Sequence, residues 1–106
     1  MQTLPEGTKA YKWTPEFCET TIPAGLLRRH STKAGVWGRI RVLEGTLRYR
    51  ILEPEPEDHI LAPGVDGIVE PEVSHEVEPV GPVRFFVEFL KVPDPGGNAG
   101  DQRPSP

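Results

Sequence analysis

The most informative stretch of the chain is Gly38-Arg-Ile-Arg-Val-Leu-Glu-Gly-Thr-Leu-Arg-Tyr-Arg-Ile-Leu52. Apolar and polar residues alternate on both sides of Gly45, which is the pattern of a half-buried β-strand. We therefore predict a β-hairpin in which a turn at Gly45 joins the strands 38–44 and 46–52. Its apolar face contains Ile40, Val42, Leu47, Tyr49 and Ile51. Its other face carries Arg39, Arg41, Arg48 and Arg50, which we expect to be cross-strand neighbours.

The rest of the chain is also typical of short strands separated by turns. Residues 83–92 are rich in aromatic and β-branched side chains, and residues 67–78 have the pattern strand, tight turn at Pro71, strand. Residues 59–61 form a further short strand in this interpretation. Because 13 prolines and 11 glycines occur among 106 residues, a helical bundle is disfavoured. We expect one all-β domain, folded as a small β-barrel or jelly roll.

Composition also sets the expected boundaries and excludes some partners. The domain is predicted to span residues 1–92, beginning with an extended arm at 1–15, and residues 93–106 to form a disordered tail rich in proline and glycine. The formal net charge of −4 disfavours a general affinity for nucleic acid or anionic membranes. No apolar run is long enough to span a bilayer, and residues 1–7 lack a signal-peptide pattern, so we expect a cytoplasmic protein.

Two histidines, His30 and His75, lie near the ends of predicted strands. If a barrel brings them together with a carboxylate, the three side chains would form a facial site for a divalent transition metal. The alternative is that each is an ordinary surface or hydrogen-bonded histidine.

Four segments carry a resemblance to a known family. They are Pro23-Ala24-Gly25-Leu26 with Arg29-His30, Gly35-Val36-Trp37-Gly38, Pro71 to His75, and Phe85-Phe86-Val87-Glu88-Phe89. From about Leu4 to Val92 the chain resembles the small single-domain cupins of the TehB-like, YeaR-like family, which is associated with tellurite resistance. The resemblance implies a cupin-type β-barrel or jelly roll.

The cupin motifs imply a ligand set for one metal ion. The spacing from Gly64 to His75 is similar to the second cupin motif, and His30 occupies the leading histidine position of the first. The sequence departs from the first motif at Thr32, where a second histidine is usual, and near Gly38, where a glutamate is usual. The resemblance therefore implies His30 and His75 as metal ligands, completed by Glu88 or Glu70 and water. Zinc and iron are the preferred ions, with nickel, manganese and copper as further candidates.

Each carboxylate candidate has an alternative interpretation. Glu88 lies within an apolar run, so it either faces the metal or points outward and pairs with a basic residue such as Arg84 or Arg39. Glu70 either swings into the barrel mouth or is a solvated turn carboxylate.

The expected ligand pocket includes Thr32, Trp37 and Arg39 near the barrel mouth. The four-arginine face is either an anion site or, in the preferred interpretation, a solvent face neutralised by Glu76 and Glu78 or by a dimer partner.

Three function hypotheses follow, and the sequence leaves open whether the protein is an enzyme. The first is a metalloenzyme that acts on a small molecule at the barrel mouth. The second is a non-catalytic protein that binds an oxyanion or metabolite in a stress response. The third is a degenerate cupin that serves as a structural module, with a homodimer as the expected assembly.

Overall fold

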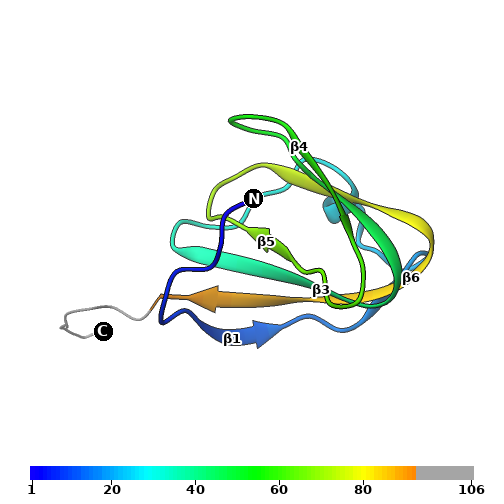
Figure 1. Cartoon of the computed structure of the whole chain (residues 1–106), viewed down its shortest axis with the longest axis horizontal. Helices are drawn as coiled ribbons and strands as arrows, with labels where there is room; N and C mark the ends of the chain where they lie inside the picture. Colours follow the sequence, from blue (N-terminus) through cyan, green and yellow to red (C-terminus); the bar gives the residue numbers. More distant parts are fainter. Residues whose placement is uncertain (93–106) are drawn as a thin grey trace.

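Two long antiparallel strands, β3 (Val36–Ile51) and β6 (His75–Lys91), organise the computed structural model, which describes residues 1–92 (Figure 1). They pair along almost their whole length, from Val36 opposite Lys91 to Ile51 opposite His75. The other strands are β1 (Lys9–Trp13), β2 (Phe17–Cys18), β4 (Glu57–Leu61) and β5 (Gly67–Val69). The 3₁₀ turn η1 (Ala24–Leu27) is the one helical element among the described residues.

The six strands form a single antiparallel sheet in the order β1-β6-β3-β4, with β2 added to β6 and β5 added to β3. The predicted all-β fold is thus confirmed, although the sheet stays open between its edge strands β1 and β4 and is not a closed barrel. No helix in residues 1–92 has the length and apolar character needed to cross a membrane. The predicted tail, residues 93–106, lies outside the described residues.

The predicted hairpin at Gly45 is wrong, because β3 passes through this position as one strand. The ladder with β6 is irregular between Val42 and Glu44 and between Gly45 and Leu47, which marks β-bulges. The inward positions are even-numbered before this point and odd-numbered after it. A bulge shifts the alternation by one residue just as a turn would, so the sequence pattern alone does not distinguish the two.

The apolar face of β3 was predicted correctly. Ile40, Val42, Leu47, Tyr49 and Ile51 are all buried. They pack in one cluster with residues of β4, β5 and β6. The strands predicted within residues 59–61, 67–78 and 83–92 also occur, but residues 75–78 and 83–91 belong to the single strand β6. Part of the predicted arm is a strand as well, since β1 pairs with β6.

Candidate functional site

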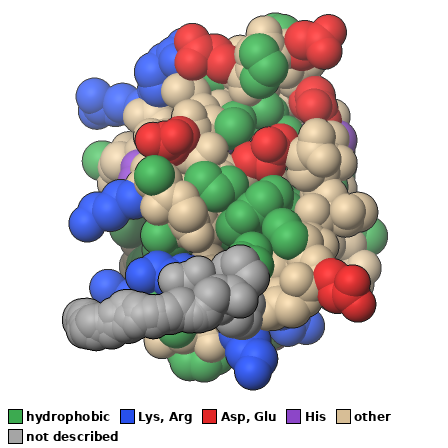
Figure 2. Space-filling view, turned by 90° about the vertical axis from the view of Figure 1, so that its left-hand side faces the viewer, with side chains coloured by type: hydrophobic (Ala, Val, Ile, Leu, Met, Phe, Trp, Pro, Cys, Tyr) green, Lys and Arg blue, Asp and Glu red, His purple; other side chains and the backbone are tan. Residues whose placement is uncertain are grey.

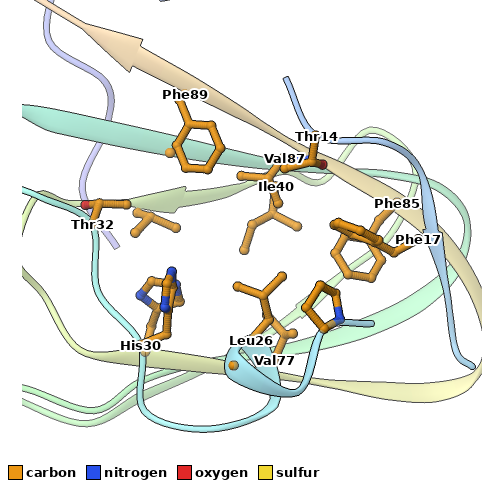
Figure 3. Close-up of a pocket in the computed structure, with 15 residues that line it drawn as sticks. Thr14, Phe17, Leu26, His30, Thr32, Ile40, Val77, Phe85, Val87 and Phe89 are labelled. Atoms are coloured by element: carbon orange, nitrogen blue, oxygen red, sulfur yellow. The ribbon is translucent and has the colours of Figure 1, made fainter. Parts of the chain in front are cut away.

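The curled sheet and η1 enclose a cavity of about 270 Å³ (Figure 3). Its lining is mostly apolar and includes Leu26 of η1, Ile40 of β3, and Val77, Phe85 and Val87 of β6. At one end two imidazole rings and Thr32 line the cavity, whereas the other threonine of the lining, Thr14, lies apart from them beside Val87. A cavity with this composition favours a small, largely apolar molecule and offers few positions for polar recognition.

His30 and His75 lie side by side at the polar end of the cavity. The backbone N–H of His30 donates to the carbonyl of His75 at 2.9 Å, and the N–H of His75 donates to the carbonyl of His30 at 2.8 Å. Residues in such a reciprocal pair project their side chains to the same side of the ladder. The ring centroids are 5.4 Å apart, and the ring planes cross at 81°. The local backbone pairing therefore brings the two predicted histidines together.

The environment of His75 fixes which of its nitrogens carries the proton. His75 is 4% exposed, and its Nδ1 lies 3.1 Å from the carbonyl oxygen of Val73. Since a carbonyl oxygen only accepts hydrogen bonds, Nδ1 is the donor. Burial lowers the pKa of His75, against the raising effect of the Val73 hydrogen bond and with a further lowering effect from His30. The ring is thus neutral near pH 7, and Nε2 keeps a free lone pair.

Tyr49 supports His75 from the side of β3. The two ring centroids are 5.8 Å apart in an edge-to-face arrangement, and the Tyr49 hydroxyl donates to the carbonyl of Ile68 at 2.8 Å. Burial raises the pKa of this hydroxyl, so it remains protonated. The sequence pattern placed Tyr49 on the correct face but gave no reason to distinguish it from the other core residues.

Of the three predicted pocket residues, only Thr32 lines the cavity. Its hydroxyl donates to the carbonyl of Val36 at 2.7 Å. Trp37 and Arg39 flank Gly38, which does line the cavity, and neighbouring residues of a strand point to opposite faces. The sheet therefore directs Trp37 and Arg39 away from the histidines.

Glu88 lies on the opposite face of the sheet from the histidines, so the first of its two interpretations is wrong. Its carboxylate accepts hydrogen bonds from Nε of Arg39 at 2.6 Å and from Nε1 of Trp13 at 2.8 Å. Nη1 of Arg41 is 3.7 Å away. Burial alone would raise the pKa of Glu88, but the hydrogen bonds from Trp13 and Arg39 and the charges of both arginines outweigh it and lower the pKa.

Glu70 does not complete the site either. It lies on the turn before Pro71, where its backbone carbonyl accepts a 3.4 Å hydrogen bond from the Thr32 hydroxyl, and it does not line the cavity. Within residues 1–92, no third histidine, cysteine, aspartate or glutamate joins His30 and His75 in a metal-binding group. The predicted carboxylate ligand is therefore missing from the part of the chain that the structure describes.

The four arginines are not the cross-strand cluster that we predicted. They follow one another along β3, two on each side of the bulge. Arg48 donates to Asp58 at 2.9 Å, and Arg50 donates to Glu76 at 2.8 Å and to Glu78 at 3.0 Å. The arginine face is thus largely neutralised by carboxylates of this chain.

Comparison with known proteins identifies the family. Residues 12–87 match the TehB-like domain. The chain belongs to the TehB-like family. It is 33% identical over 72 residues to a probable S-adenosyl-L-methionine-dependent methyltransferase, TehB of Haemophilus influenzae, covering 64% of this chain and 25% of TehB. The chain thus spans about a quarter of the length of TehB. An uncharacterized protein of Escherichia coli, YeaR, is 28% identical over 103 residues, which covers 89% of this chain and 87% of YeaR.

Solved structures of relatives share the fold. A crystal structure of an E. coli K12 protein superposes with a TM-score of 0.78 at 26% identity and covers 89% of this chain and 100% of that chain. TehB of H. influenzae gives a TM-score of 0.74 at 27% identity, covering 82% of this chain and 32% of that chain. Hydroxypropylphosphonic acid epoxidase from S. wedmorenis gives a TM-score of 0.53 at 20% identity, over 72% of this chain and 40% of that chain. This last likeness concerns the fold alone.

Proposed function

We propose that the chain is a small-molecule-binding protein that holds one transition-metal ion with His30 and His75 at the polar end of its cavity. The observation that carries the proposal is the neutral, Nδ1-protonated ring of His75 beside His30. Metal-binding histidines characteristically donate one ring N–H to a carbonyl and present the other nitrogen to the ion. His30 is partly exposed, lies next to the buried His75, and lines the same mostly apolar cavity.

The donor set fits a metal ion in part. Two imidazole nitrogens suit zinc, copper and nickel, and they leave the other coordination positions to water or to a ligand. Non-haem iron sites ordinarily add a protein carboxylate, which the described residues do not bring to the histidines. Zinc is therefore the first ion to test.

The residues of this chain would do the binding, and the ion would supply Lewis-acid polarisation of a ligand oxygen. Leu26, Ile40 and Val77 exclude water from the body of a bound molecule, which strengthens electrostatic contacts at the polar end. The methyltransferase activity named for TehB forms no part of the proposal, because the match covers only a quarter of that protein.

An anion site on the arginine face is not supported as a second function. Arg39 is held by Glu88, and Arg48 and Arg50 are held by acidic neighbours. Binding an oxyanion there would require the loss of these ion pairs.

The test is a metal titration of chelator-treated protein by calorimetry, with Zn²⁺ first and Co²⁺, Ni²⁺ and Cu²⁺ after it. The third histidine, His59, offers a matched control, because it pairs with Glu57 at 2.8 Å and does not line the cavity. We expect the wild type and His59→Ala to bind one ion. His30→Ala and His75→Ala should each weaken binding at least about tenfold. Absence of binding for all four ions, or equal affinities in all variants, would overturn the proposal.

A further inference from the structure

A second cavity adjoins the first at the histidine end. Its volume is about 280 Å³, and the residues that it does not share with the first are Tyr11, Lys12, Ser31, Lys33 and Val36. Three lining residues, His30, Thr32 and Phe89, belong to both cavities. The shared residues make the two spaces neighbours, and His30 lies between a strongly apolar cavity and one with a larger polar share.

A bulge in the edge strand β1 builds one wall of the second cavity. The register of β1 with β6 shifts between Ala10 and Lys12. In a regular strand, Tyr11 and Lys12 would point to opposite faces, but here both line the cavity. Bulges that re-aim a side chain are common at the edges of sheets and beside binding sites.

Within residues 1–92, no carboxylate pairs with the lysines that line this cavity. In the described part of the protein, neither Lys12 nor Lys33 forms an ion pair, whereas Arg39, Arg48 and Arg50 all do. Figure 2 views the end of the molecule where β1 begins and β6 ends, with basic side chains gathered along the left and lower edges around hydrophobic ones.

The two acidic residues that the backbone brings beside Thr32 do not line either cavity. Glu70 and Glu72 adjoin Pro71, whose backbone bridges to Thr32, but neither carboxylate lines a cavity. The two ammonium groups are thus available to an anion from outside.

We infer that the ligand is a small amphipathic anion, whose apolar body occupies the first cavity and whose carboxylate head lies in the second cavity between Lys12 and Lys33. The inference deepens the proposed function, since it names the ligand class for the same site. The apolar lining selects the body, and the unpaired ammonium groups select the charge. The carboxylate oxygens of the ligand then lie close to His30, which lines both cavities.

The experiment compares acids with neutral amides of the same shape. Butanoate, hexanoate and phenylacetate are titrated by calorimetry into metal-free protein, each beside its amide. The variant Lys12→Met with Lys33→Met keeps the apolar stems and removes both charges. Lys9→Met is the matched control, because Lys9 lies on the same strand and lines neither cavity.

We expect at least one acid to bind roughly tenfold or more tightly than its amide to the wild type and to Lys9→Met. The preference should vanish in the double variant. Binding of the acid should also shift the ring-proton resonances of His30 in NMR spectra and leave those of His59 unchanged. Equal binding of acids and amides, a preference that survives in the double variant, or no binding of any acid would overturn the inference.

The design separates this inference from the metal proposal. The titrations use metal-free protein, so an acid preference lost in the lysine variant supports the ligand class even if no ion binds to the histidines. Zinc binding that depends on His30 and His75 together with no acid preference would support the metal site and overturn the ligand class.

Discussion

Each face of β6 buries one ionisable side chain, but the one on the outer face is charged and the one on the inner face is neutral. On the outer face, Glu88 is 7% exposed and remains ionised, because Arg39 and Trp13 donate hydrogen bonds to it. On the inner face, His75 is 4% exposed and sits in a mostly apolar cavity without a charged partner among the described residues. A carboxylate has to be paired to be buried in its charged form, whereas an imidazole can be buried by remaining neutral.

The two groups differ in whether they are free to bind a further molecule or ion. Each carboxylate oxygen of Glu88 already accepts a hydrogen bond from this chain, so this residue stabilises the sheet. Among residues 1–92, no hydrogen bond uses Nε2 of His75, so this residue is suited to a ligand. The partners around a buried group, more than its burial, decide between these roles.

The largest expected effect is on the free energy of unfolding. It comes from a substitution in the bulge of β3, which determines which residues face inward and which face outward. Gly45 has φ of 79°, and a Cβ at this position would overlap the carbonyl oxygen of Pro82. Because backbone atoms cannot move aside cheaply, we expect Gly45→Ala to lower the free energy of unfolding by roughly 3 kcal/mol or more. Urea unfolding would measure this loss.

Gly81 provides the control for Gly45. Its φ is 73°, but a Cβ there has no atom within 4 Å. Gly81→Ala should therefore cost only the left-handed backbone strain, about 1 kcal/mol. Similar losses at the two glycines would contradict the steric explanation.

The second prediction tests the outer face alone. Glu88→Gln leaves the Arg39 guanidinium without its carboxylate, and we expect a loss of about 2 kcal/mol in the free energy of unfolding. Glu44→Gln is the matched control, since the Glu44 side chain is 68% exposed in its pair with Arg84 and should contribute below about 0.5 kcal/mol. Zinc affinity should be unchanged in both variants. Loss of zinc binding in Glu88→Gln would contradict the placement of Glu88 outside the metal site.

The smallest expected effect is a pH dependence of stability. His75 on the inner face and Glu88 on the outer face contribute to it in different pH ranges. Burial lowers the pKa of His75 from its ordinary value of 6.5, so the unfolded chain binds more protons than the folded chain just below that pH. Stability from this group is complete above about pH 6.5 and is lost as the pH falls below it, by up to about 1.4 kcal/mol per pH unit. The pKa of Glu88 is lowered from 4.5, so its contribution is lost only at more acidic pH.

Urea unfolding of metal-free protein between pH 7.5 and pH 5 would check this pH dependence. His75→Gln should lose less stability over the interval than the wild type, because glutamine does not titrate. His59 is present in both proteins, so the difference reports His75 together with its electrostatic coupling to His30. Equal losses in the two proteins would show that His75 is not buried as a neutral ring.

Much of the candidate site was predictable from particular residues. The spacing around Pro71 placed His75 at the start of a strand, and the resemblance to the TehB-like family singled out His30. The family match confirms that resemblance, and the structure places the two rings in contact. That Glu88 faces away from the histidines was not predictable, because the run around it is apolar on both sides and its alternation does not say which face holds the cavity.

The sequence by itself determined which residues of each strand share a face, since side-chain alternation is a local property of the extended backbone. It also determined the family and the two histidines. Only the tertiary structure decided that residues 38–52 pair with β6 and not with each other, because a bulge and a turn leave the same shift in alternation. It likewise decided that Glu88 meets Arg39 and that Lys12 and Lys33 line one cavity with His30. Those contacts join residues far apart in the chain, and no local pattern encodes them.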